Sequence, residues 1–302
     1  MKNRRLGSFW MLWALVLTAL TYFLGAAPLR AVRLQMGRGF YWLSSFALTG
    51  LIVGLHFSGL MKTPSDFLLW IAGSFFSLVI LIGLFGEFEE SGHSFQWSAA
   101  FALLVSAGLF FGTLGIGFYL KGQNLFKSAE VFLNESLKQA QIEIQVTQLV
   151  YQVPSVVLVL WMLALYASVM LEGRIRIAPH KPSLFRAELF HFRAPGWMVW
   201  LFIASLLPAF GGYGPTWVQA IFTNILNISI AVFFFQGLGV IHQVLIFLRV
   251  GLFWQVLLVL FLVVQLFMFV SCLGLADYWL DFRTKLIKWR QSRLETYKRR
   301  EK

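Results

Sequence analysis

Long apolar segments follow one another along almost the whole chain, separated by short polar stretches. A helix of about 20 mostly apolar residues spans the hydrocarbon core of a bilayer, and helices satisfy all their backbone hydrogen bonds internally. The pattern therefore predicts an all-α fold, a polytopic transmembrane helical bundle of about eight spans. The expected spans are residues 8–26, 39–59, 66–86, 97–120, 152–171, 195–210, 217–247 and 250–275.

Two of these spans have unusual lengths. Segment 195–210 is short, so it either crosses the membrane or re-enters from one side. Segment 217–247 would rise about 46 Å as a helix, more than the roughly 30 Å of a hydrocarbon core. It must tilt, protrude or break, and Gly237 and Gly239 mark its weakest point.

Polar segments divide the chain into blocks. Residues 87–96 predict a short acidic loop, and residues 121–150 predict an amphipathic interfacial helix, although 141–147 alternate as a strand would. The expected organisation is a five-span block at 1–171, a basic connector at 172–194, a three-span block at 195–276 and a basic amphipathic tail at 277–302.

Composition agrees with a membrane protein. Hydrophobic residues make up 59% of the chain and charged residues 13%, whereas soluble domains have about 25% charged residues. Cys272 is the only cysteine, so no intramolecular disulfide or cysteine-based metal cluster can form. The five histidines lack metal-ligand spacing, and we expect no metal and no cofactor. The apolar run at 9–24 is expected to be a retained first span, not a cleaved signal peptide.

The net charge of +12 is concentrated at the C-terminus, where the last twenty residues hold nine Lys and Arg. This end effect does not indicate nucleic-acid binding by the protein as a whole. The positive-inside rule places the C-terminus in the cytoplasm but leaves two orientations open for the N-terminus. The tail suits a helix on anionic lipid headgroups, with docking of an acidic partner or RNA as the alternative. Its anchoring residues would be Asp277, Asp281, Arg283, Trp279 and Trp289.

Small residues at four-residue spacing mark two further helix faces. Gly50 and Gly54 form one, and Gly108 and Gly112 form the other. Such faces let neighbouring helices approach closely in a membrane, so we expect helix packing there.

Span 217–247 carries polar residues that need partners in lipid. On a helix, Asn224 and His242 lie at the same angle, Asn227 lies about 60° to one side, and Gln236 lies well away from that line. These four residues either form a ligand-binding pocket for a small solute or make interhelical hydrogen bonds. Gly237 and Gly239 would either admit a neighbouring backbone or let the helix unwind, as in many transporters.

No catalytic motif is present: the chain lacks a P-loop, a nucleophile elbow and a zinc-protease signature. We therefore expect a protein that is not an enzyme.

Three ordered motifs carry a family resemblance. The stretches FHFRAPGWMVWLF (190–202), ILNISIAVFFFQGLGVIH (225–242) and LGLADYWLDFR (273–283) together resemble the YybS-like family of bacterial multi-pass membrane proteins. The resemblance implies a bacterial inner-membrane location. The positions within the shared motifs are Asn227, Gln236, Gly237, His242, Asp277, Asp281 and Arg283.

That family is similar in layout to the substrate-binding membrane components of energy-coupling-factor transporters. Those components present an Ala-x-x-x-Ala face on their first span, whereas Ala14 and Ala19 here have a different spacing. Two functions follow as expectations. One is a transport-related protein that binds a small solute among the C-terminal spans. The other is a membrane scaffold that recruits a protein partner, or a second copy of itself, through the basic tail.

Overall fold

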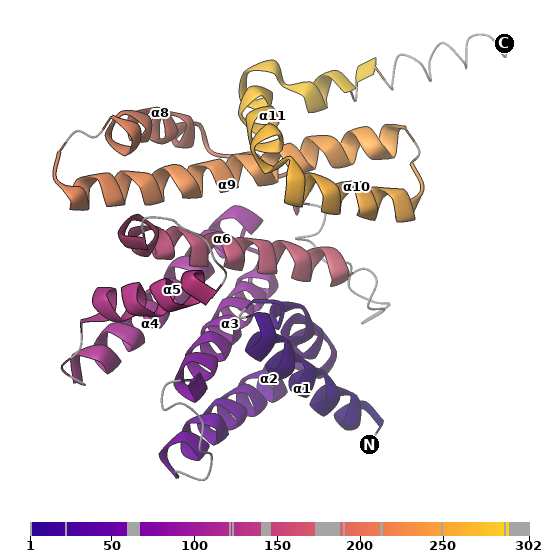
Figure 1. The fold of residues 1–302 in the computed structure, drawn as a ribbon. Helices are drawn as coiled ribbons and strands as arrows, with labels where there is room; N and C mark the ends of the chain where they lie inside the picture. The colour runs from indigo at the N-terminus through magenta and orange to yellow at the C-terminus, as the bar shows by residue number, and fades with distance from the viewer. Residues whose placement is uncertain are drawn as a thin grey trace. The chain divides into compact units, whose positions relative to one another are not determined.

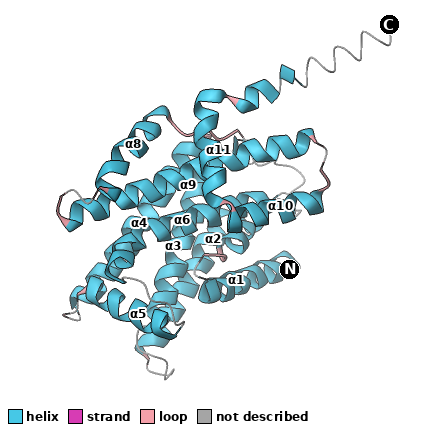
Figure 2. Cartoon of the chain, turned by 45° about the horizontal axis from the view of Figure 1, so that its top comes forward, coloured by secondary structure: helices cyan, strands magenta, loops and turns pink. Residues whose placement is uncertain are grey.

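The chain forms two compact units, Met1–Arg186 and Ala187–Lys302. The computed structural model describes residues 2–21, 23–58, 67–120, 122, 124–139, 146–172, 188–189, 191–211, 214–248, 250–286 and 288–289. Helices are the only regular elements in this described part of the chain, as Figure 2 shows by its colouring. The boundary between the units falls inside the predicted connector, 172–194.

The first unit is a helical bundle built around α2 and α3 (Figure 1). Helix α2 packs against α1, α3 and α6, and α3 also packs against α4. A row of large apolar side chains on α3, including Phe75, Leu78, Ile82 and Phe85, is completely buried and forms the centre of the unit. Its helices are α1 (Lys2–Thr21), α2 (Ala26–Phe57), α3 (Phe67–Glu90), α4 (Phe95–Leu120), α5 (Leu125–Gln139) and α6 (Val146–Glu172).

The second unit is organised by one long helix, α9 (Thr216–Phe247), which packs against α8 (Gly196–Phe210) and α11 (Phe267–Leu280). Helix α10 (Leu252–Gln265) lies between α9 and α11 in the sequence and contacts both. Phe233, Phe234 and Leu238 on α9 are almost completely buried and make up the core of this unit.

The predicted fold class is confirmed. Five helices in the described residues are long and apolar enough to cross a membrane: Ala26–His56, Ile71–Glu90, Phe95–Ile116, Leu149–Met170 and Thr216–Leu245. Three shorter apolar helices among the described residues, Gly7–Thr21, Gly196–Phe210 and Phe267–Leu280, join these five, in agreement with about eight spans.

The second predicted span, 39–59, has a helical extension that the sequence analysis took for a loop. Helix α2 already begins at Ala26 and is broken at Gly37, which has φ 79° and ψ 171°. Glycine lacks a Cβ and so adopts this positive φ without steric cost. The short limb before the break, residues 26–36, is mostly buried.

The prediction of an acidic loop at 87–96 holds only for residues 91–94 and is wrong at both ends. Helix α3 continues to Glu90, a turn follows, and α4 begins at Phe95. The glutamates remain helical because they form ion pairs with arginines of the α2 limb, described below.

The last two predicted spans also differ from expectation. Helix α9 runs for 32 residues without a break at Gly237 or Gly239. The break falls instead in the predicted span 250–275, at Leu266 with φ −120° and ψ 29°, and this residue separates α10 from α11.

The predicted amphipathic helix 121–150 is represented by α5, and α6 begins at Val146. Residues 140–145, which hold most of the strand-like pattern, lie outside the described residues. The same is true of 290–302 in the tail, whose described part is helical at 282–286 and 288–289.

Candidate functional site

Helices α9 and α11 touch through their backbones at two glycines. A Cβ added to Gly274 would lie 1.8 Å from the carbonyl oxygen of Phe233, and one added to Gly237 would lie 2.1 Å from that of Val270. Only a residue without a side chain fits at either position. Of the two roles predicted for Gly237, the structure contains the close approach of a neighbouring backbone, in an unbroken helix.

A buried polar cluster lies beside this contact, and we call it the Asp277 centre. It consists of Gln236 on α9, Asp277 on α11, Arg283 after α11 and the backbone N–H of Ala194 before α8. The Ala194 N–H donates to Oε1 of Gln236 at 2.8 Å, and Nε2 of Gln236 donates to Oδ2 of Asp277 at 3.3 Å. Nε of Arg283 donates to the same Oδ2 at 3.0 Å. The three family motifs are therefore joined in one hydrogen-bonded chain, which runs from Ala194 through Gln236 to the carboxylate of Asp277.

The Asp277 centre is shielded from solvent, because the side chains of Asp277 and Arg283 are only 1% and 3% exposed. A buried ion pair needs hydrogen bonds on its remaining atoms to offset the loss of hydration. Oδ2 of Asp277 accepts hydrogen bonds from Gln236 and Arg283. Oδ1 is buried without a hydrogen-bond partner among the described residues. An ionised carboxylate accepts through both oxygens, so Oδ1 can accept a hydrogen bond from a further donor.

A second, exposed ion pair covers this end of the unit. Arg193 pairs with Asp281, and its guanidinium also donates to Oγ1 of Thr284 at 3.4 Å. Asp281 ends α11 in the left-handed conformation, with φ 46°. The hydrogen bond with the Thr284 side chain, assisted by Arg193, lowers the pKa of Asp281. Burial lowers the pKa of Arg283, although the charge of Asp277 opposes that shift.

The four residues predicted to form a pocket on α9 do not come together. Asn224 and His242 share one face, but eighteen residues separate them by about 27 Å along the axis. Asn224 donates its side-chain N–H to Ala220 O of its own helix at 2.8 Å. Gln236 points into the Asp277 centre instead, while Asn227 and His242 are partly buried. A single small solute cannot contact all four side chains.

The remaining predicted positions have different surroundings. Gly239 is buried on α9. A Cβ added at Gly50, Gly54, Gly108 or Gly112 would meet nothing within 4 Å, so the expected close packing is not made within the described residues. These glycines lie on open helix faces, because the bundle buries the opposite sides of α2 and α4.

The two tail tryptophans also differ from each other. Both Trp279 and Trp289 are exposed, but Trp289 also packs its ring against Phe247 of α9 with 4.9 Å between the ring centroids.

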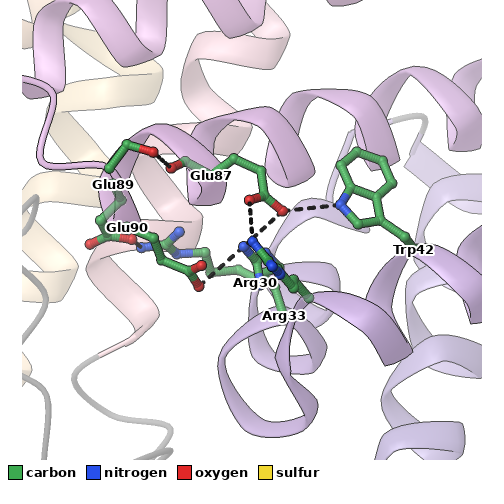
Figure 3. Close-up of polar contacts among 8 residues, drawn as sticks. Arg30, Arg33, Trp42, Glu87, Glu89 and Glu90 are labelled. Atoms are coloured by element: carbon green, nitrogen blue, oxygen red, sulfur yellow. Dashed lines mark hydrogen bonds and ion pairs between the residues drawn. The ribbon is translucent and has the colours of Figure 1, made fainter.

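The first unit holds a second charged cluster, shown in Figure 3, which the sequence analysis missed. Arg30 and Arg33, on the short limb of α2, are 1% and 2% exposed. Arg30 pairs with Glu89. NH2 of Arg33 lies 3.0 Å from Oε1 of Glu87 and 3.1 Å from Oε1 of Glu90. We call these five residues the Arg33 cluster.

Neighbouring residues shape the space around the Arg33 cluster. A Cβ on Gly86 would lie 3.1 Å from Nε of Arg33, and a Cβ on Gly83 would lie 2.3 Å from the Trp42 ring. Nε1 of Trp42 donates to Glu87 Oε1 at 3.1 Å. Arg38, beyond the break in α2, is 73% exposed and lies 4.0 Å from Glu87.

A signal for this cluster is present in the sequence. Arg30 and Arg33 are three residues apart and therefore share one helix face, and Glu87, Glu89 and Glu90 stand together at the end of an apolar run. Because both stretches were placed outside the predicted helices, the pairing of the two arginines with the three glutamates was not predicted.

The apolar helices and the buried ion pairs define a multi-pass helical membrane protein. A protein-family model described as "Predicted membrane protein (DUF2232)" matches residues 128–278, which is half of the chain. The chain belongs to this family, and the match confirms the resemblance to YybS-like proteins. Comparison with curated proteins and with solved structures gave no match.

The matched segment covers part of what has been described. It includes Ala194, Gln236 and Asp277, and it ends before Asp281 and Arg283. The Arg33 cluster precedes it.

Proposed function

We propose that the protein is a transport-related, non-enzymatic membrane protein that binds a small polar solute at the Asp277 centre. One observation carries the proposal: Oδ1 of Asp277 is buried and has no hydrogen-bond partner among the described residues. Ionisable groups are costly inside a membrane protein, and those that are retained commonly mark solute or ion pathways. The proposal places the protein in a bacterial inner membrane with its C-terminus in the cytoplasm.

The chemistry of the Asp277 centre limits the solute. The carboxylate of Asp277 and the guanidinium of Arg283 cancel each other's charge. A strongly charged solute would add an uncompensated charge to a buried site, which is costly. The best fit is a small neutral or zwitterionic molecule whose N–H or O–H group donates to Oδ1.

The surroundings of Asp277 favour binding because they are held in place before a solute arrives. Gln236 is fixed by the backbone N–H of Ala194, and the Gly237–Gly274 contact fixes α9 against α11. A preorganised site loses less conformational entropy on binding than a mobile one.

A thermal-shift screen of the purified full-length protein in detergent tests this function. Vitamins, nucleobases and amino acids are suitable probes, because each class offers N–H or O–H donors. A solute at about 100 times its dissociation constant stabilises the folded state by about 2.7 kcal/mol. The shift should disappear in the charge-free double variant Asp277→Asn/Arg283→Gln and persist in the control Asn224→Ala, whose side chain donates to Ala220 of its own helix and lies outside the Asp277 centre.

A second function has its own supporting observation. Lys285 and Lys288 are exposed beside Trp289, which is fixed against Phe247. Cations next to an interfacial aromatic suit the anionic headgroups of a cytoplasmic leaflet, on which the tail would recruit a protein partner or a second copy of the chain. Truncation after Arg283 should then remove co-purifying partners without affecting solute binding. Unchanged partners after truncation would contradict this function.

A further inference from the structure

We propose that the Arg33 cluster is a binding site for an oxyanion, a carboxylate or phosphate group, and that the side chain of Glu90 occupies this site when no ligand is bound. The site lies in the first unit and does not depend on the solute site proposed above. It takes an anionic group, whereas the Asp277 centre favours a neutral or zwitterionic one.

The first step rests on the burial of two guanidinium groups. Arg30 and Arg33 are 1% and 2% exposed, on a limb that a helix break separates from the rest of α2. Broken helices with charged groups near the break are a common way to build solute sites in membrane proteins. Arginine binds carboxylate and phosphate in particular, because its planar donors match two oxygens of either group.

The second step is an unused donor. Nε of Arg33 is buried and has no hydrogen-bond partner among the described residues, although NH2 of the same side chain contacts two carboxylates. Buried polar groups are nearly always hydrogen-bonded, so a lone N–H donor calls for an acceptor. Gly86 packs closely against this side chain, because a Cβ there would lie 3.1 Å from Nε, so a larger residue would crowd the nitrogen.

The third step identifies the group that a ligand would displace. Glu90 is 54% exposed, and among the described residues its side chain forms one ion pair, with Arg33 at 3.1 Å. Glu87 is held more firmly, because Trp42 also donates to it at 3.1 Å. Glu90 can therefore swing into water while an external oxyanion takes its place, and the charge around Arg33 stays balanced.

Two sources could supply the oxyanion, a free small molecule or a phospholipid headgroup. Both present the same phosphate oxygens to Arg33. Inorganic phosphate is the probe for the first source, and phosphatidylglycerol in nanodiscs is the probe for the second.

The test measures the melting temperature of the full-length protein against phosphate concentration, with sodium chloride keeping the ionic strength constant. Glu90→Gln removes the competing carboxylate, so apparent affinity should rise up to about fivefold, the value of a partly exposed ion pair. Arg33→Lys keeps the charge but removes the Nε donor, so affinity should fall about tenfold. Arg38→Lys, at an exposed position outside the cluster, is the matched control and should bind as the wild type does.

The pattern across the variants decides the outcome. A phosphate response that rises in Glu90→Gln and falls in Arg33→Lys supports a site for a free oxyanion. The same pattern seen only with phosphatidylglycerol supports a lipid headgroup. A response equal in all variants, or absent with both probes, overturns the proposal. If Arg33→Lys does not fold, the absence of tighter binding in Glu90→Gln is sufficient to overturn it.

Discussion

Arg283 and Asp277 form an ion pair that is almost completely hidden from solvent, with Arg283 Nε donating to Asp277 Oδ2 at 3.0 Å. Arg283 follows the end of α11, so the pair ties the start of the tail to the helix before it. Through Gln236 the same carboxylate is linked to α9 and to the segment that precedes α8. This arrangement connects three segments that are far apart in the sequence through Gln236 and one carboxylate.

Removing one member of the ion pair should destabilise the protein more than removing both charges. Asp277→Asn leaves the Arg283 charge buried without its counter-charge, and we expect a loss of about 3–5 kcal/mol. The double variant Asp277→Asn/Arg283→Gln should recover most of that loss. Melting temperatures of the wild type and the two variants in the same detergent provide the comparison. A double variant that is less stable than Asp277→Asn would show that the charges themselves hold the fold together.

The backbone contact between α9 and α11 should not tolerate a methyl group. In Gly274→Ala the new Cβ would collide with the carbonyl oxygen of Phe233, so the helices must separate. We expect a loss of about 3 kcal/mol or more, the upper range for overpacked cores. Gly108→Ala is the control: nothing lies within 4 Å of that position, and alanine favours a helix by up to about 1 kcal/mol. Equal melting temperatures for the two variants would contradict the close contact.

The exposed pair of Arg193 and Asp281 should contribute to stability at neutral pH and lose its effect in acid. The pKa of Asp281 is lower in the folded protein than its ordinary value of 3.8. Its contribution is therefore complete above that ordinary value and disappears as the pH falls through the folded value. The melting temperature of the wild type should exceed that of Asp281→Asn at about pH 7, and the difference should vanish near pH 2. A difference that grows in acid would have the wrong sign.

In the Arg33 cluster, loss of a carboxylate should matter more than loss of the exposed arginine. Glu89→Gln removes the carboxylate that pairs with the buried Arg30 and should cost about 3–5 kcal/mol. Arg38→Gln changes a side chain that is 73% exposed and should change stability by less than about 0.5 kcal/mol. Chemical unfolding of both variants in mixed micelles measures the difference. Similar losses would mean that the charges of the cluster are not buried as described.

Much of the fold could be predicted from apolar segment length, because a lipid environment admits few alternatives to a helix. The spans 97–120 and 217–247 correspond to α4 and α9 within two residues at each end. Predicting the limb 26–36 from the sequence failed for a physical reason. Taken without their partners, Arg30 and Arg33 suggest a solvent-exposed loop. Their ion pairs with Glu87, Glu89 and Glu90 offset the cost of burying two charges, so this segment can form a buried helix.

The site was predictable only in part. Gln236, Asp277 and Arg283 were identifiable as positions within the shared motifs, and for Gln236 two roles were predicted, a solute pocket with Asn224, Asn227 and His242 or an interhelical hydrogen bond. The structure contains the interhelical bond, from Gln236 on α9 to Asp277 on α11. Helical angles describe one helix at a time and ignore both the distance along its axis and the helices packed against it. The contact of Gly237 with α11 decides which face of α9 is buried, and Gly274, which completes that contact, carried no distinguishing signal.

The most direct test of the account is isothermal titration of the strongest solute from the screen into the wild type, the charge-free Asp277→Asn/Arg283→Gln variant and the Asn224→Ala control. We predict binding to the wild type and the control with equal affinity, and binding about ten- to a hundredfold weaker in the charge-free variant, as expected when a buried charge-assisted hydrogen bond is lost. Equal affinity in all three proteins would contradict a solute site at Asp277.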